Sequence, residues 1–145
     1  MQVPFLDLKT QYQSIKSEVD TAVQEVIDSC AFILGPAVTE FEKNFAEYIG
    51  VKHAIGVDSG TQAIELALRA VGLQPGEEVI APANTFIASV LPASRLGAKP
   101  VLVEINPKTY NLDVEKIEEA ITPRTKVILP VHLYGQPVTH MEKIL

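Results

Sequence analysis

Residues 56–65 read Gly56-Val57-Asp58-Ser59-Gly60-Thr61-Gln62-Ala63-Ile64-Glu65, and this stretch is the most informative part of the sequence. The apolar residues 53–57 predict a short strand that leads into a small polar turn. The turn opens at once into a predicted amphipathic helix over residues 60–72. A strand followed directly by a helix is typical of α/β domains, which are built by repeating this unit.

The turn has the properties of a phosphate site. Ser59, Gly60 and Thr61 lie where the helix begins, so free backbone N–H groups and the positive end of the helix dipole point outward there. Gly60 lets the backbone approach a ligand closely, and the two hydroxyls add donors. Ser and Thr are also ordinary N-caps, and many such turns bind nothing, so the turn alone leaves a purely structural role open.

A second turn of the same kind strengthens the case for a binding site. A predicted strand at residues 78–81 is followed by Pro82-Ala83-Asn84-Thr85-Phe86, which opens a predicted helix over residues 85–96. In a parallel sheet both turns lie at the carboxyl edge of the strands, where α/β folds bind ligands. One turn would offer a phosphate site, and the other would offer the aromatic ring of Phe86 beside a polar pair.

The rest of the chain continues the alternation of strand and helix. The pattern predicts two more strands, at residues 99–104 and 125–131, and further helices at residues 11–30, from Pro36 to Gly50, at 113–121 and from Thr139 onward. The strands are apolar without clean alternation, which indicates a parallel sheet covered on both faces. We therefore expect an α/β domain with about four strands and right-handed crossovers.

Composition narrows the class of protein. The 145 residues are close to one ordinary domain, and 47% of them are hydrophobic, enough for a core. A net charge of −6 argues against nucleic acid or an anionic membrane as a partner. No signal peptide is visible, and no apolar run approaches a membrane span. The single cysteine, Cys30, excludes an intramolecular disulfide and favours the cytoplasm, and we expect it to be packed.

His132 is the third candidate residue for the site. It follows the predicted strand at residues 125–131, on the same sheet edge as the two turns. A lone histidine is more often a hydrogen-bonded structural residue, so its position is the argument for a functional role. The three histidines are too dispersed for a zinc site, and we assign no metal ligands.

Five segments, in this order, resemble the DegT/DnrJ/EryC1/StrS aminotransferases. They are Val3-Pro4-Phe5-Leu6-Asp7-Leu8, Ile33-Leu34-Gly35-Pro36, Asp58-Ser59-Gly60-Thr61, Pro82-Ala83-Asn84-Thr85-Phe86-Ile87-Ala88 and Pro130-Val131-His132-Leu133-Tyr134-Gly135-Gln136-Pro137. The resemblance implies the three-layer fold of type I pyridoxal-phosphate (PLP) transferases, like aspartate aminotransferase. Residues 1–36 would be an N-terminal arm and helix, and residues 37–145 the first part of the PLP-binding large domain.

The resemblance also assigns roles to the candidate residues. It implies that Gly60 and Thr61 bind the cofactor phosphate and that Phe86 stacks on the pyridine ring, a flat apolar contact that suits an aromatic side chain. His132 belongs to the family's HxxG turn near the cofactor. Ser59 and Thr85 are secondary candidates for cofactor binding.

Two residues that the chemistry of the family needs are not found in matching motifs. One is the Asp of an Asp-Ala-Ala-Gln type segment, which holds the pyridine nitrogen, and the other is the Schiff-base Lys. The resemblance places both after Leu145, so we assign no catalytic residue here. Because the pyridine is the electron sink and the Lys moves the proton, we expect these 145 residues alone not to transaminate.

The function implied is that of the N-terminal part of a PLP-dependent enzyme of polysaccharide biosynthesis. It would move an amino group from an amino acid, with glutamate the expected donor, to a nucleotide-linked keto sugar, with 3-keto sugars the nearest match. Expected partners are a second copy, in a homodimer, or a C-terminal segment. Two alternatives stay open: a sugar dehydratase of the same family, in which His replaces the Lys, and a non-catalytic module that binds a partner chain or a phosphate ligand.

Overall fold

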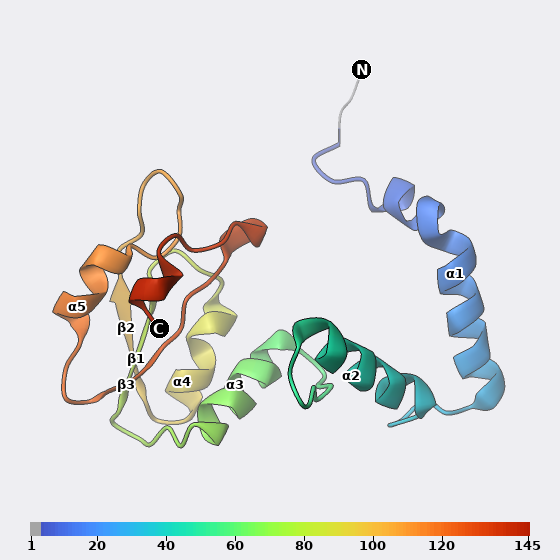
Figure 1. The fold of residues 1–145 in the computed structure, drawn as a ribbon, viewed down its shortest axis with the longest axis horizontal. Coiled ribbons are helices and arrows are strands. Elements are labelled where there is room, and N and C mark those ends of the chain that lie inside the picture. The colour runs from blue at the N-terminus through green and yellow to red at the C-terminus, as the bar shows by residue number, and fades with distance from the viewer. Residues whose placement is uncertain (1–3) are drawn as a thin grey trace. The chain divides into compact units, whose positions relative to one another are not determined.

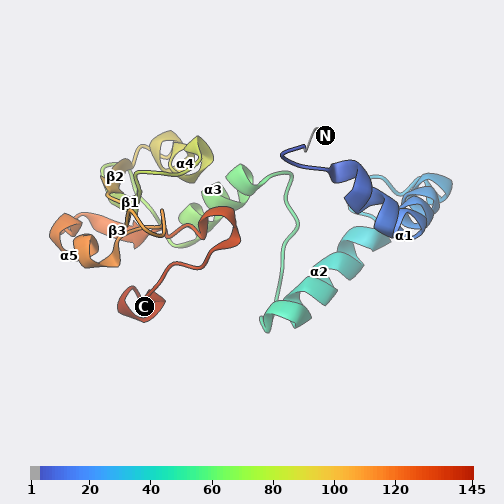
Figure 2. The ribbon, with the colours of Figure 1, turned by 90° about the horizontal axis from the view of Figure 1, so that it is seen from above.

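The computed structural model describes residues 4–145, which Figures 1 and 2 show in two views. Val3 of the first family motif lies outside the described residues. The chain divides into two compact units, Met1–Gly56 and Val57–Leu145, and each is described by itself.

The first unit contains two helices, α1 (Leu8–Ser29) and α2 (Pro36–Ile49). α1 begins earlier than predicted, because the carboxylate of Asp7 caps it by accepting the N–H of Thr10 at 3.0 Å. α2 begins at Pro36 and is closed by Gly50, as predicted. Gly50 has a φ of 77°, and its N–H bonds the carbonyls of Ala46 and Glu47, which is a left-handed C-cap.

The first unit buries little of its apolar surface. Among its described residues only Ala46 is buried, although apolar side chains follow helical spacing on both helices. Cys30 is exposed, so the expectation that it is packed is wrong. α1 has 22 residues, but neither it nor any other described helix combines the length and apolarity needed to cross a membrane.

The second unit is an α/β domain with a parallel three-stranded sheet in the order β2-β1-β3. Its elements in chain order are α3 (Gly60–Ala70), β1 (Glu78–Pro82), α4 (Leu91–Arg95), β2 (Lys99–Val103), α5 (Ile117–Ala120) and β3 (Thr125–Ile128). The chain steps from β1 to β2 in one direction and then returns across β1 to β3. The two crossovers run in opposite directions along the sheet, and α4 and α5 lie on opposite faces of it, as Figures 1 and 2 show.

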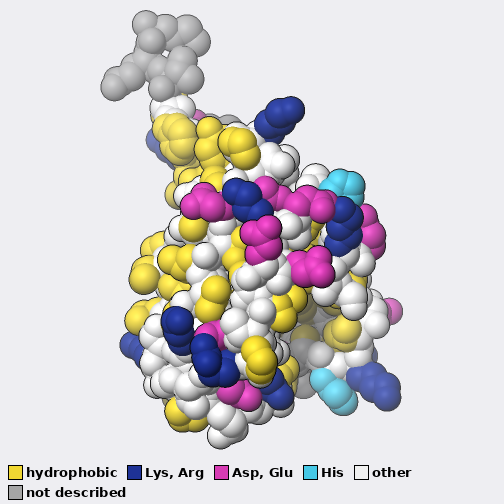
Figure 3. All heavy atoms as spheres, turned by 90° about the vertical axis from the view of Figure 1, so that its left-hand side faces the viewer, with side chains coloured by type: hydrophobic (Ala, Val, Ile, Leu, Met, Phe, Trp, Pro, Cys, Tyr) yellow, Lys and Arg dark blue, Asp and Glu magenta, His cyan; other side chains and the backbone are white. Residues whose placement is uncertain are grey.

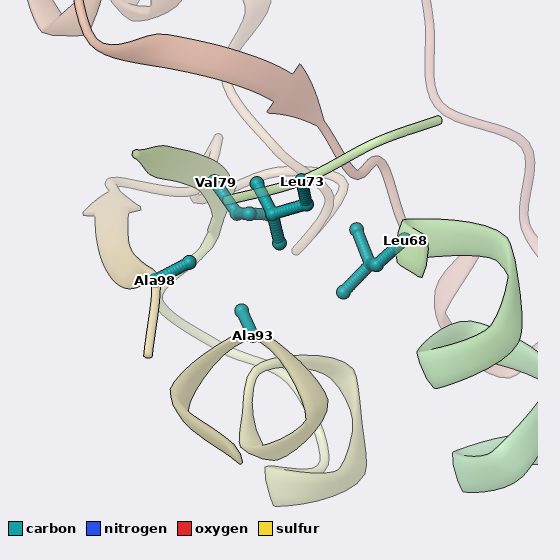
Figure 4. Packing of buried hydrophobic residues seen from close by; sticks show 5 residues of the cluster. All are labelled: Leu68, Leu73, Val79, Ala93 and Ala98. Carbon is teal, nitrogen blue, oxygen red and sulfur yellow. The ribbon is translucent and has the colours of Figure 1, made fainter. Parts of the chain in front are cut away.

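Each face of the sheet has its own core. Val79 of β1 packs with Leu68 of α3 and Ala93 of α4, in a cluster that also includes Leu73 and Ala98 (Figure 4). The next residue, Ile80, faces the other way and packs with a second cluster: Val103, Leu112 and Ile117. The predicted three-layer fold with a mostly parallel sheet is therefore confirmed.

The outer surface of α5 is charged. Glu118 and Glu119 of this helix are exposed, as is Glu115 in the short 3-10 helix before it, Val114–Lys116. Figure 3 views this side of the molecule and shows acidic and basic side chains interspersed on it. These glutamates form a solvated face.

A bulge in β3 corrects the direction of its side chains. Glu78 pairs with Thr125, but Val79 pairs with Val127, so Lys126 is an extra residue without a partner on β1. Because of this extra residue, Val127 packs with the cluster around Val79 and Ile128 with the cluster around Ile80. A regular ladder would instead direct Lys126 to the face of Val79, and the bulge leaves it exposed.

A buried carboxylate, Glu78, holds the amino ends of all three strands. It accepts the Thr122 hydroxyl at 2.6 Å and the Arg124 guanidinium at 2.9 Å, both just before β3. The Lys99 ammonium, at the start of β2, lies 3.9 Å away. The hydrogen bond from Thr122, followed by that from Arg124 and the charges of Arg124 and Lys99, lowers the pKa of Glu78 below its usual value.

Two predicted elements differ from the structure because of hydrogen bonding. Residues 53–57 form no strand, since no segment among residues 4–145 pairs with them; the N–H of Gly56 instead donates to a Glu42 carboxylate oxygen at 2.7 Å. The predicted helix over residues 85–96 is divided into a 3-10 helix, Ile87–Ser89, and α4. Pro92 has no N–H to continue a helix from the preceding turn, so α4 starts anew at Leu91.

Two further predictions were too long. β3 stops at Ile128 rather than residue 131; the N–H of Leu129 still bonds the Ile80 carbonyl, but Pro130 has no N–H to extend the ladder. The helix predicted from Thr139 is a three-residue 3-10 helix, Met141–Lys143, entered through His140 with a φ of 59°.

Candidate functional site

The Ser59-Gly60-Thr61 turn has the geometry of an anion-binding helix start. Ser59 is the N-cap of α3, and its hydroxyl accepts the N–H of Gln62 at 3.2 Å. Its carbonyl accepts the N–H of Ala63 at 2.9 Å. The N–H groups of Gly60 and Thr61 come before any carbonyl of their own helix that could accept them, so they are directed outward at the positive end of the dipole.

Gly60 is a glycine that the described fold does not need. Its φ is outside the left-handed region, so an L residue fits its backbone, and a Cβ built on it meets no atom within 4 Å. Gly50 and Gly135, in contrast, have φ values of 77° and 84° that favour glycine. The lack of a side chain at Gly60 leaves the backbone N–H groups at the start of α3 open to close approach.

The second turn presents an aromatic ring. Phe86 follows β1, and its side chain is 74% exposed. Its carbonyl accepts the N–H of Ser89 at 2.9 Å, and the hydroxyls of Thr85 and Ser89 are bonded at 2.8 Å, so the turn is fixed on both sides of the ring. A large apolar ring held exposed on a fixed turn is suited to stacking on a flat ligand.

The structure gives His132 a hydrogen-bonding role in the fold. Its Nδ1 accepts the N–H of Val138 at 3.0 Å, which closes the loop after β3. This bond sets the tautomer, so that in the neutral ring the proton is on Nε2. Gly135, with its left-handed φ, forms the predicted HxxG turn within this loop. Binding of the cofactor by His132 stays a prediction.

Asn111 joins two loops at the carboxyl edge of the sheet. It is 1% exposed, and its amide nitrogen donates to the carbonyls of Gln136 and Pro137 at 2.9 and 3.1 Å. Its side-chain oxygen accepts the N–H of Leu133 at 3.1 Å. The loop after β2 is thereby tied to the loop after β3. Sequence reasoning missed Asn111, because Tyr110-Asn111 reads as an ordinary turn.

A cavity of about 440 Å³ lies beside this connection. It is lined by residues from the loops after all three strands: Asn84, Thr109, Tyr110, Leu133, Tyr134 and Gln136. We call it the tyrosine pocket. The second candidate turn is part of it through Asn84, and α3, which begins at Gly60, packs against the 3-10 helix that follows Phe86. The structure therefore gathers the sequence candidates in one unit, although the ring of His132 does not line this pocket.

Comparison with known proteins identifies the family of the chain. Residues 13–145 match the model of the DegT/DnrJ/EryC1/StrS aminotransferase family, and the chain belongs to this family. It is 51% identical over 135 residues to dTDP-3-amino-3,4,6-trideoxy-alpha-D-glucose transaminase from Streptomyces venezuelae. The match covers 93% of this chain and 36% of that protein, so the chain spans about a third of the relative's length.

Solved structures share the fold. A crystal structure of DesV from S. venezuelae superimposes with a TM-score of 0.92 at 49% identity, covering 99% of this chain and 38% of DesV. NtdA from Bacillus subtilis, solved with bound cofactor PMP, superimposes with a TM-score of 0.90 at 42% identity, covering 99% of this chain and 33% of NtdA.

Proposed function

We propose that these residues form the phosphate-binding and ring-stacking part of a PLP-dependent aminotransferase that acts on a nucleotide-linked keto sugar. The observation that carries the proposal is Gly60, a glycine without a conformational or packing reason, at the start of α3. The family supports the reaction, and the name of a similar transaminase, which contains a dTDP-linked 3-amino sugar, supports the 3-keto position.

Each candidate residue has a physical role in this proposal. The N–H groups of Gly60 and Thr61 bind the phosphate of PLP, while the hydroxyls of Ser59 and Thr61 add donors. Phe86 covers one face of the pyridine ring and excludes water from it. Thr85 holds the Phe86 turn through Ser89, and His132 has Nε2 left to donate toward the site. When bound, PLP supplies the electron sink for amino-group transfer.

We also propose the partners and setting of the reaction. An amino acid, glutamate in our proposal, is the amino donor, and the enzyme is a cytoplasmic homodimer. Support for the homodimer comes from the apolar faces of α1 and α2, which the described residues leave largely exposed. Support for the cytoplasm comes from the single, unpaired cysteine.

The proposal is tested by adding inorganic phosphate and PLP to the 145-residue chain and following backbone amide NMR shifts. We expect the largest shifts at Gly60 and Thr61. Gly60→Ala keeps both N–H groups but places a methyl group where the phosphate approaches, so it should weaken phosphate binding by about tenfold or more. The free energy of unfolding should not fall, because Ala fits this backbone and restricts the unfolded chain.

Gly56→Ala is the matched control, because Gly56 also has a φ outside the left-handed region and a Cβ there meets only ordinary contacts. This variant should bind phosphate like the parent chain. Ser59→Ala should instead lose about 1 kcal/mol of stability with its cap. Shifts centred away from Gly60 and Thr61, or equal phosphate affinity in Gly60→Ala, would show that the turn is only a helix cap.

A further inference from the structure

The tyrosine pocket has the chemistry of a site for an uncharged ring. Its lining provides two phenol rings, two carboxamides, the hydroxyl of Thr109 and one leucine, and no charged side chain. Figure 1 shows that the loop after β2, which supplies Tyr110, extends beyond the arrowhead of that strand. Cationic side chains would favour a phosphate, and none lines this pocket. Aromatic faces and carboxamides instead suit a hydroxylated or carbonyl-bearing ring of neutral charge.

Both tyrosines are held in an unusual backbone conformation. Tyr110 has a φ of 60° and Tyr134 a φ of 54°, in the left-handed region that bulky residues rarely adopt. Tyr134 is fully exposed and Tyr110 is 59% exposed, so burial of these rings within the described chain does not account for their conformation. Each ring is presented at the cavity by a turn closed by a backbone hydrogen bond, from the Tyr110 N–H to the Asn106 carbonyl at 2.8 Å and from the Gly135 N–H to the His132 carbonyl at 3.0 Å.

The loops are fixed without help from either tyrosine. Asn111 ties them through three hydrogen bonds, two from its amide nitrogen and one to its side-chain oxygen. Val138, buried at the end of the second loop, donates its N–H to His132. Because these contacts leave the Tyr110 and Tyr134 side chains out, the two rings can be removed without dismantling the pocket.

We propose that the tyrosine pocket binds the sugar ring of the substrate, with Tyr110 and Tyr134 packing on its apolar C–H faces and Asn84 and Gln136 bonding its hydroxyls. The choice of a sugar as the ring rests on the proposed function. The pocket is separate from the Ser59-Gly60-Thr61 turn in residues and in chemistry, so the two sites can be tested independently.

The experiment uses methyl α-D-glucopyranoside, thymidine and inorganic phosphate as three separate probes of the full 145-residue chain, followed by amide NMR. We expect the glucoside to shift the amides of Tyr110, Tyr134 and Gln136 in a saturable manner at millimolar concentration, and phosphate to shift Gly60 and Thr61. Tyr134→Ala and Tyr110→Ala should each weaken glucoside binding by roughly two- to tenfold, the range of one aromatic contact.

Two further variants keep the result interpretable. Tyr134→Gly removes the ring and suits the positive φ, so it should fold at least as well as the parent chain and still bind the glucoside more weakly. Tyr48→Ala removes an exposed tyrosine of α2 and should not change glucoside binding.

The outcomes separate the two proposals. Glucoside shifts that are absent, centred elsewhere or unchanged in the tyrosine variants overturn the pocket assignment, whatever phosphate does. If thymidine shifts the pocket amides and the glucoside does not, the assignment of the pocket to a sugar ring is overturned, and the pocket binds the nucleobase instead. Glucoside shifts at the pocket with no phosphate shifts at Gly60 and Thr61 retain the sugar site and overturn the proposed cofactor-phosphate site.

Discussion

At the scale of single residues, Glu78 links stability to pH. Its pKa is lowered in the fold, chiefly by the Thr122 hydroxyl and then by Arg124, so the unfolded chain binds its proton more readily. Its contribution is therefore complete above the unfolded pKa of about 4.3 and is lost as pH falls through the lower folded pKa. Glu78→Gln should lower the free energy of unfolding at pH 7. It should also make that free energy depend less on pH in the acid range, because Gln does not titrate.

Urea unfolding followed by circular dichroism from pH 2 to 7 measures this effect. Glu118→Gln is the matched substitution of an exposed carboxylate on α5, and it should change stability at pH 7 by less than about 0.5 kcal/mol. Parallel acid curves for the parent chain and Glu78→Gln would mean that the charge of Glu78 does not stabilise the fold.

At the scale of elements, the β3 bulge makes one residue dispensable. Deletion of Lys126 would pair Val127 and Ile128 with Val79 and Ile80 as before, in a continuous ladder. Deletion of Leu102, in the regular ladder of β2, would instead move the Val103 side chain to the opposite face of the sheet, away from the cluster around Ile80. We expect the first deletion to fold cooperatively and the second to lose about 1.5–3 kcal/mol or more, as measured by urea unfolding. Equal losses would show that Lys126 is needed where it is.

Local pattern predicted the elements that depend on nearby residues. The two caps at Ser59 and Gly50, the parallel sheet and the two-sided covering of β1 all follow from periodicity and turn residues close in sequence. Residues 53–57 were predicted wrongly, because a strand exists only when a second segment pairs with it, and apolar composition does not provide that segment.

The candidate site likewise has parts that the sequence predicted and parts that it did not. The Ser59-Gly60-Thr61 and Asn84-Thr85-Phe86 turns were visible in the sequence, because each turn directly precedes a predicted helix. The tyrosine pocket and Asn111 were not, since the side chain of Asn111 bonds the backbone of Leu133 and Gln136, residues 22 and 25 positions away. The left-handed tyrosines also violate the local preference that sequence reasoning uses.

At the scale of the whole molecule, the exposed apolar helix faces predict association. Ile15, Val19, Val23 and Ile27 follow one face of α1 and are 36–54% exposed, and Phe41 and Phe45 of α2 are 57% and 45% exposed. Covering one such side chain is worth roughly 1.5–3 kcal/mol. We expect sedimentation at micromolar concentration to give a mass above that of one chain, and Val23→Glu to reduce it.

Thr21→Glu is the control. It introduces the same negative charge as Val23→Glu, but Thr21 lies on the opposite side of α1. It should leave the sedimentation behaviour unchanged. A compact monomer that melts cooperatively by near-ultraviolet circular dichroism would contradict the prediction, since it would show that these faces are stable in water.

The three hydrogen bonds of Asn111 have a consequence for the entropy of ligand binding. A buried carboxamide that serves both loops cannot release one of them without leaving its own polar atoms unsatisfied, so the loops after β2 and β3 open together or not at all. A ligand that enters between them meets a wall that is already ordered. Little conformational freedom of the backbone is then lost on binding, and even weak contacts with the ring can contribute to affinity.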